Sequence, residues 1–207
     1  MKHFLRISVA SFLLLMGALA IASTEAPPLD IVRTTTDNVL ERVKTDKETL
    51  RAEPGKMYDL VAELIFPHFD FAIMAQWVLG DSWAGADEAT RAAFVDQFRK
   101  LLVRTYATAL IEFSDQTIGY PDADAAIAAN TATVKQEISQ PGSSSIPIVY
   151  RLHNKTGDWK VFDVSVDGVS LIKTYRASFA AAIKNDGLPA LIQSLETKNQ
   201  RFAAKTQ

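Results

Sequence analysis

The chain contains no cysteine and only three histidines among its 207 residues. Without cysteine it cannot build a disulfide framework or a thiol nucleophile. His68 and His153 have no further ligand at metal-site spacing, so no metal is expected. The glycine signatures of nucleotide binding are absent, and so is the G-x-S-x-G pattern of a serine nucleophile. The sequence therefore predicts no cofactor and offers no common catalytic motif.

A strong charge of one sign is also missing. The chain has 22 Lys and Arg against 24 Asp and Glu, and the basic residues form no polybasic run. Proteins that bind nucleic acid usually carry a basic patch or stripe. The composition therefore argues against nucleic acid as a partner.

Long hydrophobic runs are confined to the N-terminus. Lys2, His3 and Arg6 precede the uncharged segment ISVASFLLLMGALAIA, which ends in the A-x-A pattern at 20–22. This arrangement is typical of a secretory signal peptide. The segment is shorter than the roughly 20 residues that a membrane-spanning helix needs, and it has no cysteine for a lipoprotein anchor. We expect residues 1–22 to be cleaved and the rest to act in a bacterial periplasm.

Residues 23–207 would then carry 20 basic and 24 acidic side chains, a formal net charge of −4. A chain of this length can bury one sizeable core. No internal repeat or linker indicates a second part. We expect one domain over residues 23–207, and nothing in the sequence requires more than a monomer.

The spacing of apolar residues predicts helices first, then strands, then helices again. The first helices are expected at 28–43, 57–65, 70–79 and 88–113, with 44–56 as a charged connector. Residues rich in β-branched and aromatic side chains follow at 116–120, 131–138, 146–154 and 158–172, and two last helices centre on 175–183 and 188–195. Short loops between consecutive strands favour an antiparallel meander. The predicted class is α+β, a curved antiparallel sheet packed against several α-helices.

Asp163 leaves an enzymatic alternative open. It lies among the apolar residues of the last strand segment. A lone carboxylate in an apolar pocket can act as a general base with a raised pKa, and small α+β cone folds house isomerases of that type. Pairing of Asp163 with the nearby Lys160 is the structural alternative.

The stretch FPHFDFAIMAQWVLGDSW, residues 66–83, holds five of the nineteen aromatic residues. Such a stretch forms either an ordinary core or the wall of an apolar pocket. Composition alone does not decide between the two.

Four segments in order resemble the MlaC family of periplasmic phospholipid-binding proteins, also called toluene-tolerance auxiliary proteins. They are FPHFDFAIMAQWVLGDSW, RAAFVDQFRKLLVRTYATAL, IPIVYRL and DWKVFDVSVDGVSLIKTYRASF. The resemblance covers roughly residues 28–195. It implies a carrier without catalytic residues, whose apolar pocket takes the acyl tails while the head group stays near solvent.

The resemblance also implies partners. The family carries phospholipid between an outer-membrane lipoprotein–porin complex and an inner-membrane ABC transporter with an MCE-domain subunit, preserving the lipid asymmetry of the outer membrane. Related proteins are tied to hopanoids, so the lipid species stays open. Lys173 and Arg176 are candidates for contacts with partner proteins.

On this basis we expect twelve side chains to line the lipid pocket: Phe71, Met74, Trp77, Val78, Phe98, Leu102, Tyr106, Leu110, Ile148, Tyr150, Val164 and Val166. The strand residues in this set share one face in the simplest register, and a bulge near Phe162 would reverse it. Arg104 and Arg151 are the candidates for a bidentate phosphate contact at the mouth. For each of the two, a salt-bridged surface role is the competing interpretation.

Overall fold

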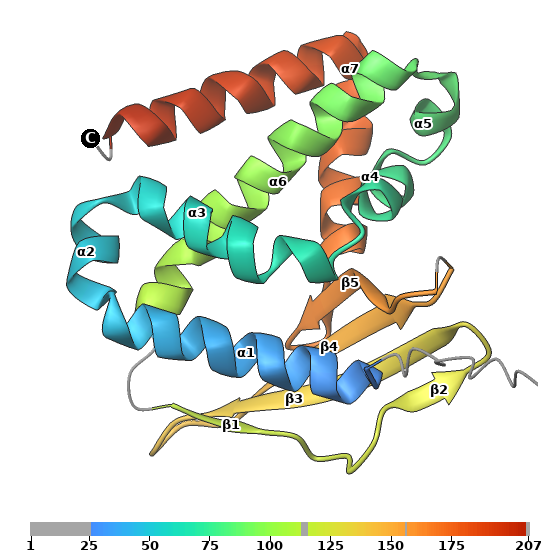
Figure 1. Ribbon diagram of the computed structural model, residues 1–207. Helices are drawn as coiled ribbons and strands as arrows, with labels where there is room; N and C mark the ends of the chain where they lie inside the picture. The colour runs from blue at the N-terminus through green and yellow to red at the C-terminus, as the bar shows by residue number, and fades with distance from the viewer. Residues whose placement is uncertain (1–25, 113–115, 156, 206–207) are drawn as a thin grey trace, which may run out of the picture.

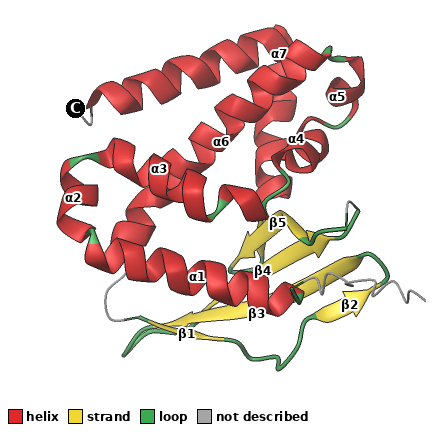
Figure 2. Ribbon diagram, viewed as in Figure 1, coloured by secondary structure: helices red, strands yellow, loops and turns green. Residues whose placement is uncertain are grey.

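The computed structural model describes residues 26–112, 116–155 and 157–205. The predicted signal peptide, residues 1–22, lies outside the described residues. Strands form a sheet at one side of the molecule and helices gather over one of its faces (Figures 1 and 2). The helical elements are α1 (Pro28–Thr45), α2 (Lys47–Ala52), α3 (Pro54–Leu64), η1 (Phe66–His68), α4 (Phe71–Leu79), α5 (Asp81–Gly85), α6 (Glu88–Ile111) and α7 (Leu171–Lys205).

The helix boundaries follow local sequence signals. Pro28 and Pro54 open α1 and α3 at positions where a missing backbone N–H costs nothing. Asp70 caps α4 by accepting a hydrogen bond from the Ile73 backbone N–H at 2.9 Å, and Asp87 caps α6 through the Thr90 N–H at 2.7 Å. Gly80 ends α4 with a φ of 56°, a conformation that favours glycine.

The strands are β1 (Thr117–Gly119), β2 (Ala126–Ala128), β3 (Thr131–Ser139), β4 (Ile146–His153), β5 (Lys160–Val166) and β6 (Val169–Ser170). They form one sheet in the order β1-β3-β4-β5-β6, with β2 also paired to β3. All these strand pairs are antiparallel, as predicted. Asp167 and Gly168 form the tight turn between β5 and β6, both at positive φ.

A β-bulge interrupts the pairing of β4 with β5. Arg151 pairs with Asp163 while Leu152 pairs with Val161, so Phe162 is the extra residue. The bulge lies beyond the Ile148–Val166 and Tyr150–Val164 pairs, so these four side chains keep a common face. The predicted register therefore holds for them, although the bulge is present.

The core divides into three clusters. One joins α4, α6 and α7, the second joins the start of α1 to the sheet, and the third joins α1, α2 and α3. Helix α6 contacts both the first and the third cluster. Apolar residues of α6 therefore pack against two different sets of helices.

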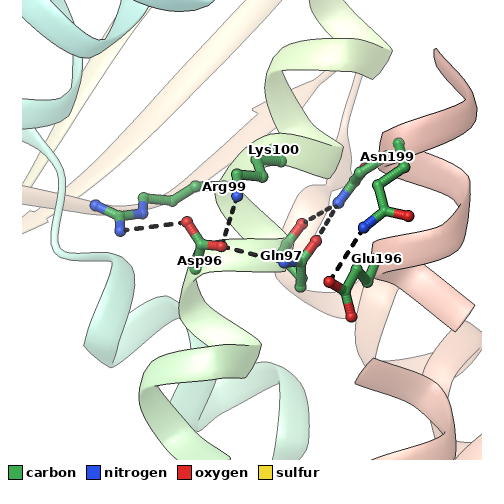
Figure 3. A network of polar contacts seen from close by, with 7 residues as sticks. Asp96, Gln97, Arg99, Lys100, Glu196 and Asn199 are labelled. Atoms are coloured by element: carbon green, nitrogen blue, oxygen red, sulfur yellow. Dashed lines mark hydrogen bonds and ion pairs between the residues drawn. The ribbon is translucent and has the colours of Figure 1, made fainter. Parts of the chain in front are cut away.

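The C-terminal part of α7 is fixed on α6 by polar contacts. Asn199 donates from Nδ2 to the backbone oxygen of Gln97 at 3.0 Å and to Gln97 Oε1 at 2.9 Å (Figure 3). Gly187, with a φ of 83°, breaks α7 into two helical parts where the sequence predicted two helices.

Four elements were not expected, one of them the three-residue 3-10 helix η1. Helix α2 forms inside the segment predicted as a charged connector, because Leu50 is buried against its neighbours in the third cluster. Helix α5 and strand β2 were also missed, since each is too short to show a period. Of the predicted helix 88–113, α6 covers Glu88–Ile111, and residue 113 lies outside the described part.

Candidate functional site

A cavity of about 280 Å³ lies where the three core clusters meet. Its wall comes from α1, α3, η1, α4, α6 and the start of α7 on the helical side and from β1, β3, β4 and β5 on the sheet side. Protein interiors normally contain few voids larger than one water molecule. The cavity is therefore too large to be an ordinary packing void, and its size is that of a binding site.

The wall is almost entirely apolar. Among the described residues that line it, none is Asp, Glu, Lys or Arg. Apolar cavities of this kind stay dry and accept apolar molecules. The wall's chemistry suits hydrocarbon and gives no carboxylate for acid–base catalysis.

Nine of the twelve predicted pocket residues line the cavity: Phe71, Met74, Leu102, Tyr106, Leu110, Ile148, Tyr150, Val164 and Val166. Helical spacing on α6 and alternation on β4 and β5 bring them to one space. Tyr106 is 38 % exposed, so its ring reaches solvent as well as the cavity.

The other three predicted residues do not line the cavity in the structure. Trp77 is 51 % exposed and lies against Phe162, with ring centroids 6.5 Å apart. Val78 and Phe98 are buried in the cluster of α4, α6 and α7 behind the wall. Phe98 stacks on Phe94 at 5.6 Å. Periodicity identifies the buried side of α4 and α6 but not which of two apolar neighbours each residue contacts.

A small polar network interrupts the apolar wall. Gln136 donates from Nε2 to Thr36 Oγ1 at 3.0 Å and to Tyr120 Oη at 2.9 Å, and it accepts from the Tyr150 hydroxyl at 2.9 Å. These residues come from α1, β3, β4 and the chain after β1. The network satisfies a glutamine that is only 2 % exposed and fixes α1 over the sheet.

Burial changes the acidity of two wall tyrosines. It raises the pKa of Tyr150 well above its ordinary value, with the nearby Tyr120 adding to the rise. It also raises the pKa of Tyr106 to about 12, with a contribution from Tyr175. Both phenols are therefore neutral and act as hydrogen-bonding groups at physiological pH.

Arg151 and Asp163 pair with each other, which is the salt-bridged alternative considered for each of them. Arg151 Nη2 lies 2.7 Å from Asp163 Oδ2, and the pair is on the strand face opposite Tyr150 and Val164. Asp163 also accepts from the Ser170 hydroxyl at 2.7 Å and from the Ile172 N–H at 3.2 Å, at the start of α7. Arg151 is thus held by a carboxylate and is not among the residues that line the cavity. Asp163 is a buried structural carboxylate rather than a pocket base, and its partner is Arg151, not Lys160.

Arg104 is also absent from the cavity wall. It lies on α6 between the wall residues Val103 and Tyr106 and is partly buried. Neither of the two predicted arginines, Arg104 and Arg151, is therefore part of the cavity wall.

The sequence interpretation missed the contribution of α1. Its residues Ile31, Val32, Thr35, Thr36, Val39 and Leu40 all line the cavity. His68 and Gln136 were missed as well. The sequence did contain one signal. Thr35 and Thr36 interrupt the apolar face of α1, and polar residues are unusual on a helix face that packs only against core.

An α+β fold whose sheet and helices enclose an apolar cavity defines a protein that binds an apolar molecule. The chain belongs to the MlaC family, whose model, described as MlaC protein, matches residues 33–197. The predicted family resemblance is thereby confirmed.

Curated relatives agree in sequence over most of the chain. It is 28 % identical over 177 residues to the Toluene tolerance protein ttg2D of Pseudomonas putida, which covers 84 % of this chain and 82 % of that protein. It is 23 % identical over 187 residues to the Intermembrane phospholipid transport system binding protein MlaC of Haemophilus influenzae, with 89 % and 86 % covered.

A solved structure agrees in fold. The phospholipid-binding protein from Ralstonia solanacearum, in complex with a phospholipid, matches with a TM-score of 0.78 and 31 % identity. The match covers 86 % of this chain and 99 % of that chain. It confirms the predicted α+β class. In the part of the chain that the structure describes, no helix is both long and apolar enough to span a bilayer.

Proposed function

We propose that this protein is a periplasmic phospholipid carrier. It takes up one lipid at a time, holds the acyl chains in the cavity, and moves between an outer-membrane lipoprotein–porin complex and an inner-membrane ABC transporter with an MCE-domain subunit. This traffic maintains the lipid asymmetry of the outer membrane. The names of the relatives and the phospholipid held by the Ralstonia protein support the cargo class.

The observation that carries the proposal is the apolar, uncharged wall of the cavity. Each CH₂ group removed from water is worth about 0.8 kcal/mol, so two acyl chains of about fifteen methylenes hold roughly 24 kcal/mol. A lipid cannot cross an aqueous compartment at a useful rate against that cost. A carrier works by offering the chains an apolar space comparable to the membrane.

The periplasmic location and the two partner complexes rest on the signal-like N-terminus and on family membership. A carrier needs no catalytic group of its own, which agrees with the absence of catalytic motifs from the sequence. Any energy input comes from the transporter.

The direct test is native mass spectrometry of the protein purified without detergent from the periplasm of a bacterium that expresses the full chain. An adduct of phospholipid mass, confirmed by organic extraction, is the expected result. A folded protein at the mass of its bare chain, which takes up no lipid from phospholipid vesicles either, would contradict the proposal.

A matched pair of substitutions shows whether the cavity holds the lipid. Val164→Glu places a charge in the apolar wall, whereas Ser165→Glu places the same charge on the other face of β5. The first variant is expected to lose the adduct and the second to keep it. The melting temperature of each variant verifies that it is folded.

A further inference from the structure

Most polar groups of the cavity wall already have partners. Thr36, Gln136 and Tyr150 bond to one another in the network beneath α1. The hydroxyl of Tyr106 interacts with Tyr175. His68, in η1, is the one imidazole among the described residues of the wall and the one side chain there that can carry a positive charge.

A lysine stands next to this histidine. Lys160, the first residue of β5, donates from Nζ to the backbone oxygen of Pro67 at 2.7 Å. Because Pro67 precedes His68, this bond holds the ammonium group beside the cavity wall. An ammonium group has three N–H donors, so the bond to Pro67 leaves two of them available.

No carboxylate neutralises Lys160 in the described part of the chain. The two buried or half-buried carboxylates nearby have other partners: Asp163 pairs with Arg151, and Asp70 accepts a hydrogen bond from His153. The charge of Lys160 also reaches His68, where burial first and then this charge lower the pKa of the imidazole. Lys160 therefore places an ammonium group next to His68, at the η1 end of a cavity whose described wall contains no lysine or arginine.

We propose that Lys160 and His68 form the subsite for the phosphate group of the cargo. The subsite rests on the proposed carrier function, and it replaces Arg104 and Arg151 as the expected phosphate ligands. Two ammonium N–H donors and a neutral imidazole N–H match the oxygen acceptors of a phosphodiester. The acyl chains then extend from η1 into the space beneath α1 and α6.

The test compares two lipids with identical acyl chains, dioleoyl phosphatidylglycerol and dioleoylglycerol, offered in phosphatidylcholine vesicles. The phosphatidylcholine background is the same in both experiments, so the two offered lipids differ in that only phosphatidylglycerol carries a phosphate group. Lys160→Met and His68→Phe are the test variants, and Lys173→Met, on exposed α7, is the charge-matched control. Bound lipid is quantified by mass spectrometry after the protein is separated from the vesicles.

We expect Lys160→Met to lower uptake of phosphatidylglycerol about tenfold, the effect of one lost charge-assisted hydrogen bond. His68→Phe should lower it by a smaller factor, because its bond is uncharged. Uptake of dioleoylglycerol should stay within about twofold, and Lys173→Met should change neither lipid. If Lys160→Met destabilises η1, His68→Phe still tests the subsite, because it leaves the Lys160–Pro67 bond in place.

Three outcomes would overturn the subsite. Equal loss of both lipids would mean that the residues only support the cavity, and loss of neither would mean that the phosphate binds elsewhere. If phosphorus NMR shows that inorganic phosphate binds the lipid-free protein through Lys160 while phosphatidylglycerol uptake is unchanged, the site serves a free anion. Failure of the unsubstituted protein to take up either lipid would instead contradict the carrier function itself.

Discussion

Asp70 and His153 join the segment before α4 to the end of β4, with Asp70 Oδ2 3.0 Å from His153 Nε2. The other carboxylate oxygen of Asp70 caps α4. His153 Nδ1 accepts from the Lys155 backbone N–H at 3.3 Å, so Nε2 is the nitrogen that donates to Asp70. One carboxylate thus fixes both the start of α4 and the cavity edge at η1 to the sheet.

We expect Asp70→Ala to lower the free energy of unfolding by about 2 kcal/mol, of which about half is the lost cap and half the lost bond to His153. Asp87→Ala is the matched control, because Asp87 caps α6 from an exposed position. It should cost only about 1 kcal/mol. Urea unfolding of both variants measures the difference, and equal costs would show that the His153 bond adds nothing.

The sequence predicted elements that have a clear period or cap. The predicted helices at 70–79 and 88–113 and the predicted strands at 131–138, 146–154 and 158–172 correspond to α4, α6 and the strands β3 to β5. Helix α2 was not predicted, because only one of its residues, Leu50, is buried. The partners that bury Leu50 come from other helices and are brought to it only when the chain folds.

The cavity itself was harder to predict, for a physical reason. Residues that pack in the core and residues that line a cavity recur with the same helical spacing. Phe98 and Leu102 therefore look alike on a helical wheel. Only the three-dimensional arrangement shows that Leu102 meets the cavity and Phe98 meets Phe94. In the same way, alternation placed Arg151 on a strand face, but its partner Asp163 becomes visible only through the pairing of β4 with β5.

The distinction between core and cavity wall gives a pair of substitutions on α6. Phe98→Leu should cost about 1–2 kcal/mol of stability and leave lipid uptake intact, because Phe98 is fully buried behind the wall. Leu102→Trp should narrow the cavity and reduce uptake with a smaller loss of stability. Thermal unfolding together with vesicle uptake separates the two effects. Reduced uptake by folded Phe98→Leu protein, with normal uptake by Leu102→Trp, would contradict the assignment.

Asp163 gives a prediction against the enzymatic alternative. Asp163→Asn weakens the contacts with Arg151, Ser170 and the start of α7, and should lower the free energy of unfolding by about 2 kcal/mol. Asp167→Asn is the control, since asparagine suits the positive φ of that turn, and it should be within about 0.5 kcal/mol of the original. Neither change should affect lipid uptake by the folded protein. A selective loss of function without loss of stability in Asp163→Asn would revive a chemical role.

Gly80 is required by its conformation and its neighbour. Its φ is 56°, and a Cβ there would lie 3.2 Å from Arg176 Nη2. We expect Gly80→Ala to destabilise the protein by about 1–2 kcal/mol. Gly85→Ala, where a Cβ meets nothing within 4 Å, should be neutral or slightly stabilising. Shortening Arg176 in the Gly80→Ala background would recover only the steric part, because the backbone strain stays.

The buried phenol of Tyr150 predicts a stability that falls at alkaline pH. Its pKa in the folded protein is raised by burial above the ordinary value of about 10. Below pH 10 the phenol is neutral in both the folded and the unfolded chain, and its contribution to stability is fully present. As the pH rises above 10 the unfolded chain loses this proton first, so unfolding becomes more favourable, by up to about 1.4 kcal/mol per pH unit.

Tyr150→Phe removes the titrating group, so its free energy of unfolding should fall less steeply than that of the original protein between about pH 9 and 11. The variant should also be less stable at neutral pH, by about 1 kcal/mol, because Gln136 Oε1 loses its donor. Tyr106→Phe is the comparison, since Tyr106 is partly exposed and its pKa is raised to about 12. Urea unfolding of the three proteins over this range measures the slopes. Parallel curves for Tyr150→Phe and the original would mean that Tyr150 reaches solvent through the cavity and ionises there as it does in the unfolded chain.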